Sequence, residues 1–140
     1  MINKKISIYI LIFFISFMIL LYLITDYLNG IIHINPEVLP NAVLNHPYST
    51  NITIDASVIE GSFHSEISNN NFKLIPEQRI DGNDIYGNPN IYYNYENLQL
   101  VGTSRDTQPI RITLQGTSYG SMFFSNKDFK KEYILEVKEK

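Results

Sequence analysis

Hydrophobic and polar positions divide this chain into two regions with different patterns. From Ile6 to Ile24, no charged residue, glycine or proline interrupts the apolar run. A helix rises about 1.5 Å per residue, so this run spans about 28 Å, close to the roughly 30 Å hydrocarbon core of a bilayer. Beyond Asp26 no second apolar run of this length occurs. The pattern therefore predicts one transmembrane helix over residues 6–24 that contacts the lipid bilayer.

The charges that flank the run predict its orientation. Lys4 and Lys5 precede it, and Asp26 is the first charge after it. The positive-inside bias places residues 1–5 in the cytoplasm and everything after residue 26 outside. A cleaved signal peptide would have a shorter apolar core and a small-residue cleavage site. We therefore expect an uncleaved signal anchor in the inner (cytoplasmic) membrane, followed by a juxtamembrane linker over residues 25–38.

The pattern changes to alternation in the rest of the chain. Short apolar stretches recur between turn residues, and in several of them the apolar positions lie two apart, as in a half-buried strand. These stretches are Asn51–Ala56, Gly61–Ile67, Asn71–Ile75, Ile91–Tyr95, Leu98–Val101, Ile110–Gln115 and Tyr133–Val137. About seven short strands predict an all-β fold, an antiparallel β-sandwich over residues 39–140. Residues 77–89 have little apolar content and are expected to form a long loop or an inserted hairpin.

Composition excludes several functional classes for the exported part. Residues 34–140 hold 9 Lys and Arg against 13 Asp and Glu, a net charge of −4. A nucleic-acid partner would require a basic stripe, so none is expected. The chain has no cysteine. A domain outside the cytoplasm would therefore have to be stabilised by hydrophobic packing, without disulfides. The abundance of Ile, Asn, Lys and Tyr suggests an AT-rich, bacterial genome.

Three segments carry a resemblance to a known family. Residues 39–49 read LPNAVLNHPYS and lead into the strand expected at Asn51, residues 98–104 read LQLVGTS, and residues 133–137 read YILEV. This succession resembles bacterial Ig-like domains, which open with Leu-Pro and a Pro-Tyr before the first long strand. Asn45 and Ser104 occupy positions where that family usually has Gly and Pro. The resemblance implies an Ig- or cadherin-like sandwich used for binding or spacing, and it brings no catalytic residues.

The residues favour neither catalysis nor a metal site. The three histidines, His33, His46 and His64, lack the close spacing of zinc ligands. No G-x-S-x-G elbow is present to support a serine nucleophile. Residues 81–84 read DGND, which suits a turn and lacks the order of a calcium-binding EF-hand loop, although cadherin-like domains bind calcium at their ends. We expect no enzyme activity, no catalytic residue, no metal and no cofactor.

The best candidate for partner binding is a segment rich in tyrosine and asparagine. Tyrosine combines a rigid amphipathic ring with a polar tip, and asparagine adds adaptable amide groups. On a strand, Ile91, Tyr93 and Tyr95 would share one face, expected to be core, and Tyr92 and Asn94 the other. The predicted contact residues are Tyr86, Tyr92, Asn94 and, in a later loop, Phe123.

These features together predict a single-pass membrane protein that displays an Ig-like, protein-binding domain in the periplasm or at the cell surface. The most specific form of this prediction is an envelope immunity protein that neutralises a toxin delivered by a neighbouring cell. The alternative is an accessory subunit of a secretion, pilus or division assembly. In either case the expected partner is a protein at the membrane.

Overall fold

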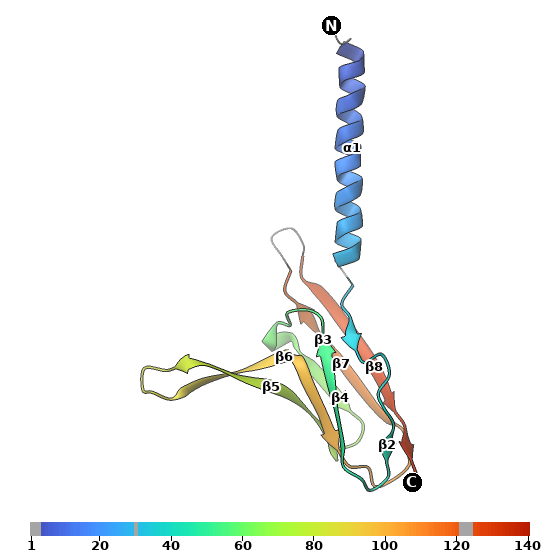
Figure 1. Ribbon diagram of the computed structural model, residues 1–140, viewed down its shortest axis with the longest axis vertical. Helices are drawn as coiled ribbons and strands as arrows, with labels where there is room; N and C mark the ends of the chain where they lie inside the picture. Colours follow the sequence, from blue (N-terminus) through green and yellow to red (C-terminus); the bar gives the residue numbers. More distant parts are fainter. Residues whose placement is uncertain (1–3, 30, 121–124) are drawn as a thin grey trace. The chain divides into compact units, whose positions relative to one another are not determined.

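The computed structural model describes residues 4–29, 31–120 and 125–140 (Figure 1). The chain divides into two units, residues 1–31 and residues 32–140. The first unit contains the helix α1, Lys4–Asn29, which includes the whole predicted apolar run. Within it, residues 8–25 are apolar and long enough to cross a membrane as an anchor or to serve as a signal sequence. The predicted apolar helix is therefore confirmed.

Polar side chains inside α1 return their hydrogen bonds to the helix itself. The Ser16 hydroxyl donates to the Phe13 carbonyl over 2.9 Å, and the Thr25 hydroxyl donates to the Leu21 and Tyr22 carbonyls over 3.0 and 2.8 Å. These bonds pair the two hydroxyls within the helix, without help from water. The apolar side chains point outward all around the helix, so α1 presents an apolar surface on every side.

The regular secondary structure of the second unit is almost all strand. In chain order they are β1 Ile34–Asn35, β2 Ala42–Val43, β3 Tyr48–Ile54, β4 His64–Ile67, β5 Phe72–Asn83, β6 Pro89–Gly102, β7 Ile110–Ser118, β8 Lys127–Leu135 and β9 Val137–Lys138, with a short 3-10 helix η1 at Glu60–Ser62. One sheet has the order β1-β3-β6-β5 and another the order β4-β7-β8. β2 and β9 form a third, two-stranded parallel pair. All other pairings are antiparallel.

The two larger sheets bury their inner faces in one hydrophobic core. On β7, Ile110, Ile112 and Leu114 are buried, and the residues between them face outward or are half-buried. On β8, Tyr133 and Leu135 repeat this alternation. From the other sheet, β3 and β6 contribute Ile52, Leu98 and Leu100 to the same core. The expected alternation on these strands is confirmed, and the arrangement is compatible with a β-sandwich.

The second unit begins earlier in the sequence than the predicted boundary at residue 39. Ile34, on β1, pairs with Ile54 of β3 and is buried in the core. The Tyr133 hydroxyl donates to the Pro36 carbonyl over 2.7 Å, which ties the segment after β1 to β8. Of the predicted linker over residues 25–38, residues 25–29 thus belong to α1, and residues 34 and 35 form β1, the first strand of the sheet.

Candidate functional site

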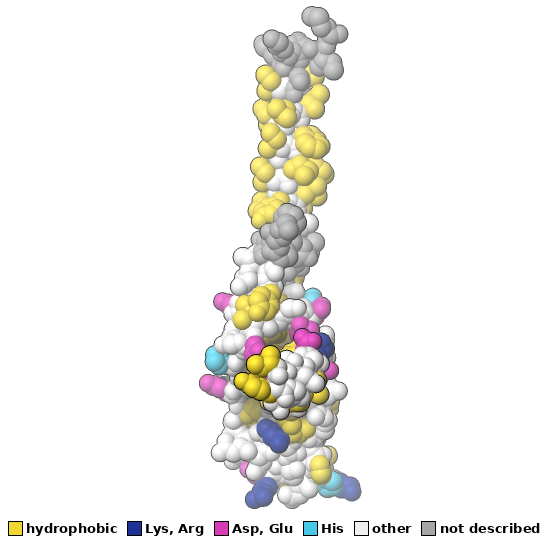
Figure 2. All heavy atoms as spheres, turned by 90° about the vertical axis from the view of Figure 1, so that its left-hand side faces the viewer, with side chains coloured by type: hydrophobic (Ala, Val, Ile, Leu, Met, Phe, Trp, Pro, Cys, Tyr) yellow, Lys and Arg dark blue, Asp and Glu magenta, His cyan; other side chains and the backbone are white. Residues whose placement is uncertain are grey.

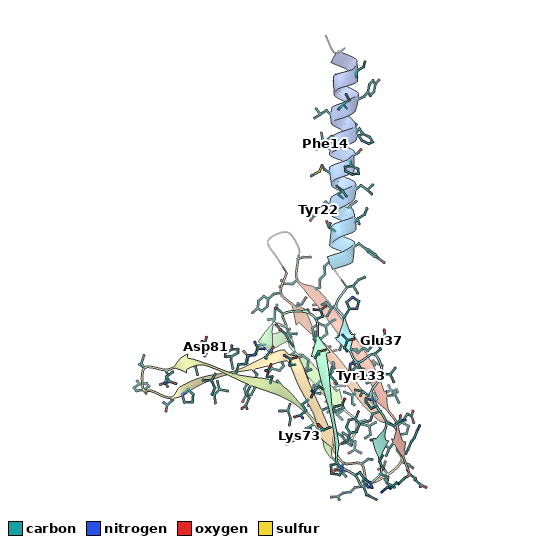
Figure 3. All side chains as sticks on the ribbon, viewed as in Figure 1. Phe14, Tyr22, Glu37, Lys73, Asp81 and Tyr133 are labelled. Carbon is teal, nitrogen blue, oxygen red and sulfur yellow. The ribbon has the colours of Figure 1, made fainter. Side chains whose placement is uncertain are left out.

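The most distinctive feature of the second unit is a hairpin arm that projects from the body. β5 and β6 are the longest strands, and their distal parts extend beyond the sheets as a two-stranded ribbon (Figure 1). We call residues 77–94 the arm. Asp81 lies along it, whereas Lys73 lies on the part of β5 that belongs to the body (Figure 3). The sequence predicts either a long loop or an inserted hairpin for residues 77–89, and the structure has the hairpin.

A bulge in β6 marks the point where the arm leaves the body. Pro76 pairs with Leu98, but the next residue of β5, Glu77, pairs with Asn94. Residues 95–97 of β6 therefore have no partners on β5, and we call them the bulge. Extra residues in one strand bend it and increase its local twist. The Tyr95 ring turns toward the body and packs against Phe63, with the ring centroids 4.9 Å apart.

The Glu77 carboxylate closes this bulge. Its Oε2 accepts hydrogen bonds from the side-chain amides of Asn94 and Asn97, both over 2.9 Å, and from Arg79 over 3.2 Å. The Asn94 side-chain oxygen in turn accepts from the Glu96 N–H over 3.1 Å. The amide hydrogen bonds, first that of Asn94 and then that of Asn97, lower the pKa of Glu77, and Arg79 contributes further. The ionised carboxylate is thus the form that holds the bulge together.

A turn over residues 84–88 closes the far end of the arm. The Asp84 and Asn88 backbones are joined by an Asp84 N–H to Asn88 carbonyl bond of 2.8 Å. Gly87 has φ +85°, a conformation that glycine adopts at little cost. The Asp84 carboxylate accepts from the N–H groups of Tyr86 and Asn88, each over 2.8 Å. Hydrogen bonds from the Asn88 side chain and backbone are the main cause of the lowered pKa of Asp84.

The two faces of the arm differ in chemistry. Cross-strand pairing places Ile80 opposite Ile91 and Gln78 opposite Tyr93 on one face. This apolar face carries no charged side chain, and its isoleucines and Tyr93 are exposed. The opposite face carries Glu77 and Arg79, with Asn94 and Tyr92 as their cross-strand partners. At the tip, Ile85 is 92% and Tyr86 is 81% exposed. Figure 2 looks onto the end of the arm, where hydrophobic side chains meet solvent.

The predicted contact residues have different positions in this arrangement. Tyr86 lies at the tip, and Tyr92 is 43% exposed on the polar face of the arm. Asn94 is only 9% exposed, because its side chain is used in the bulge. Phe123 lies outside the described residues. The expectation that Tyr93 belongs to the core is wrong, since 42% of its surface is exposed.

Sequence reasoning missed several residues that define the arm. Ile80 and Ile85 are among its most exposed apolar side chains, and Glu77 organises its base. The Gly87-Asn88 pair is a turn signal within the segment and is typical of a hairpin. The role of Glu77 has no such signal, because its amide partners, Asn94 and Asn97, lie 17 and 20 residues away in the sequence.

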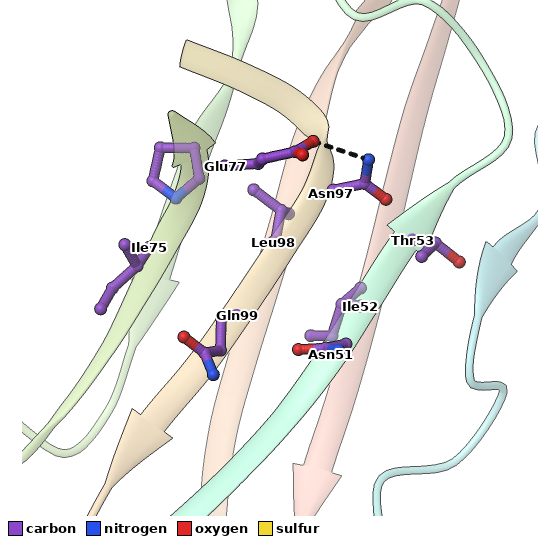
Figure 4. Close-up of a pocket in the computed structure, with 9 residues that line it drawn as sticks. Asn51, Ile52, Thr53, Ile75, Glu77, Asn97, Leu98 and Gln99 are labelled. Atoms are coloured by element: carbon purple, nitrogen blue, oxygen red, sulfur yellow. Dashed lines mark hydrogen bonds between the residues drawn. The ribbon is translucent and has the colours of Figure 1, made fainter. Parts of the chain in front are cut away.

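A shallow groove crosses the outer face of the sheet next to the base of the arm. Its volume is about 560 Å³, and Asn51, Thr53, Ile75, Asn97 and Gln99 are among the residues that line it. Glu77 and Asn97 meet at its end, joined by their hydrogen bond (Figure 4). The groove is open, and amide and hydroxyl side chains share its lining with the apolar residues Ile52, Ile75, Pro76 and Leu98. It therefore offers hydrogen-bonding groups next to the base of the arm.

Within residues 4–29, 31–120 and 125–140, no three His, Asp or Glu side chains converge as metal ligands would. The chain matches no known protein-family model, and no curated protein or solved structure is similar enough to count as a match. The arm, with its apolar face, its exposed tip and the adjoining groove, is therefore the candidate site for binding.

Proposed function

We propose that this chain is a non-enzymatic, single-pass membrane protein that presents an Ig-like domain outside the cytoplasm and binds a protein through its arm. The observation that carries the proposal is the exposure of six large side chains on the arm: Ile80, Ile85, Tyr86, Ile91, Tyr92 and Tyr93. Soluble domains rarely leave such a group of apolar and aromatic side chains in water unless a partner covers it. Tyrosine is also enriched among the residues that dominate binding energy in protein interfaces.

The order of the strands supports the Ig-like assignment. A constant-type Ig domain has strands A, B, E and D in one sheet and C, F and G in the other. The order β1-β3-β6-β5 corresponds to A-B-E-D, and β4-β7-β8 corresponds to C-F-G. In this correspondence the arm is an elongated hairpin between strands D and E. Such domains serve many unrelated functions, so the binding proposal rests on the arm and not on the fold.

Two versions of the function differ in what the helix does. In the first, the protein is an envelope immunity protein, and α1 only holds the domain at the membrane. In the second, it is an accessory subunit of an envelope assembly, and α1 also contacts other subunits. Scrambling the order of residues 8–24 while keeping their composition separates the two. An immunity protein keeps its activity after this change, whereas an assembly subunit loses its place in the complex.

The binding proposal is tested in the native membrane with a photocrosslinking amino acid. Placed at Tyr86, it should give one discrete adduct with another protein. Placed at Tyr119, which is also exposed but lies outside the arm, it should not. The double variant Tyr86→Ala/Tyr92→Ala should lose binding of the protein identified in this way, while its melting temperature stays unchanged. Equal adducts from both positions would contradict the assignment of the arm.

The membrane proposal has its own measurement. The mass of the protein extracted from membranes should include the whole of α1, because an anchor is not cleaved. The chain has no cysteine, so a single cysteine introduced at the exposed Val38 can report topology. An impermeant thiol reagent should label it in intact cells or spheroplasts. A mature chain that begins after residue 25 would show that α1 is a signal sequence.

A further inference from the structure

One edge of the arm has no neighbouring strand. In the body, β6 pairs with β3 as far as the Asn97–Thr53 pair, and β3 ends at Ile54. From Asn94 to Pro89, β6 pairs on one side with β5. On its other side, no strand among the described residues pairs with it. Backbone groups along a free edge are available to pair with a strand from another chain.

The two edges of the arm differ in how they are protected. The edge of β5 carries Glu77, Arg79 and Asp81, and its register shifts between Ile80 and Asn83. Charges and bulges of this kind discourage strand addition. The edge of β6 from Asn90 to Asn94 reads NIYYN and contains no charge. Isoleucine and tyrosine favour strands, so this edge is suited to accept one.

The same five residues are complementary to themselves. Consider two antiparallel strands related by a two-fold axis perpendicular to their sheet. Residues opposite each other must point to the same face of the sheet. The axis therefore passes beside one residue, which faces its own copy in the other chain. With the axis at Tyr92, Ile91 of one copy faces Tyr93 of the other, and Asn90 faces Asn94. Aromatic and β-branched residues are favourable cross-strand pairs. Pro89, which has no N–H, limits the pairing at one end. Tyr95, packed on the body, limits it at the other.

We propose that the arm binds a second copy of this chain by antiparallel pairing of residues 90–94 about a two-fold axis at Tyr92. The two arms then form one four-stranded sheet, and the apolar faces of both arms become continuous. The absence of charge on this edge lets two acidic units approach each other there. This inference does not depend on the proposed function, because it concerns the purified chain alone.

Cysteine crosslinking tests this register directly, because the chain has no cysteine of its own. In the full chain in detergent, Tyr92→Cys should form a disulfide-linked dimer on mild oxidation. Ile80→Cys is the matched control: Ile80 is 68% exposed against 43% for Tyr92, but it lies on β5. Random collision predicts faster crosslinking at position 80, and the proposed pairing predicts faster crosslinking at position 92. A mixture of Ile91→Cys and Tyr93→Cys chains should crosslink more than either chain alone.

Sedimentation of the full chain in detergent gives a second measurement. Tyr92→Lys places two like charges opposite each other at the axis and should convert the dimer to monomer. Ile80→Lys changes the charge of the arm equally and should leave the dimer intact. A dimer that survives both substitutions would place the interface elsewhere, for example in α1, and would overturn the proposal. The proposal would also be overturned if the purified chain were monomeric and if position 92 crosslinked in membranes only to a different protein.

Discussion

The side-chain amide of Asn94 donates a hydrogen bond to the Glu77 carboxylate over 2.9 Å, and this contact fixes the base of the arm. Glu77 is the first residue of β5 beyond the body, and Asn94 is its cross-strand partner on β6. Between Asn94 and the last paired residue of the body, Leu98, three residues are accommodated without partners on β5. The contact thus lies at the first cross-strand pair beyond the bulge, where pairing between β5 and β6 resumes.

Removing this carboxylate should loosen the arm and leave the body folded. In Glu77→Ala, Asn94, Asn97 and Arg79 lose their common acceptor. We expect faster amide hydrogen exchange over residues 77–94 and an unchanged rate in β7. As a control, Glu66→Ala, at an exposed position on β4, should change neither the exchange rate of the arm nor that of β7. Equal protection of the arm in Glu77→Ala and the wild type would contradict the role given to the carboxylate.

Acid should loosen the arm for the same reason. The pKa values of Glu77 and Asp84 are lowered by hydrogen bonds that exist only in the folded arm. A group with a lowered folded-state pKa stabilises the fold above its unfolded-state pKa, and that contribution is lost as the pH falls through the folded value. Exchange protection of the arm should therefore decline below the ordinary carboxylate range near pH 4. A Glu77→Gln/Asp84→Asn variant should show a much weaker pH dependence there.

Burial of Tyr133 predicts a loss of stability at alkaline pH. Burial raises the pKa of Tyr133 to about 12, from its ordinary value of 10.0. The unfolded chain therefore releases the proton first, so the free energy of unfolding should fall as the pH rises above 10. Tyr133→Phe should weaken this dependence, leaving the smaller contribution of Tyr48, whose pKa burial also raises. It should also cost about 1 kcal/mol at neutral pH, by removing the hydrogen bond to Pro36. Chemical denaturation over a pH series measures both.

Gly102 should not tolerate a larger residue. A Cβ at this position would lie 2.5 Å from Cγ of the Phe72 side chain and 2.7 Å from the backbone oxygen of Asn71. Relief of this overlap requires movement of a buried ring and of the backbone, so Gly102→Ala should cost about 1–3 kcal/mol of unfolding free energy. Gly61→Ala is the control, because a Cβ there would meet nothing within 4 Å. Similar melting temperatures for the two variants would contradict this packing.

Two apolar residues of the β5–β6 hairpin should differ sharply in their contribution to stability. Leu100 of β6 is completely buried between the sheets, and Leu100→Ala should cost about 2–5 kcal/mol. Ile80 of β5 is largely exposed on the arm, so Ile80→Ala should change the free energy of unfolding by less than about 0.5 kcal/mol. Denaturation of both variants in the same detergent gives the comparison. A large loss in Ile80→Ala would mean that the apolar face of the arm is covered within the monomer.

Elements with a local pattern could be predicted from the amino-acid sequence alone. The uninterrupted apolar run predicts α1, and the alternation of Ile110, Ile112 and Leu114 predicts the inward face of β7. In both cases the periodicity of the backbone decides which side chains share a face. Most strand positions followed from the same rule. Two of the predicted strands, residues 91–95 and 98–101, are parts of the single strand β6.

Which of these faces is covered depends on tertiary contacts and could not be predicted from the local pattern. Ile91 and Tyr93 alternate as regularly as the residues of β7, yet they are exposed, because β3 ends at Ile54 and no second sheet lies over the arm in the described part of the chain. Asn94, expected at the surface, is buried because the bulge brings its amide to Glu77. Periodicity specifies how side chains divide between the two sides of a strand. Burial depends on where neighbouring strands begin and end, and contacts between residues distant in the sequence determine that.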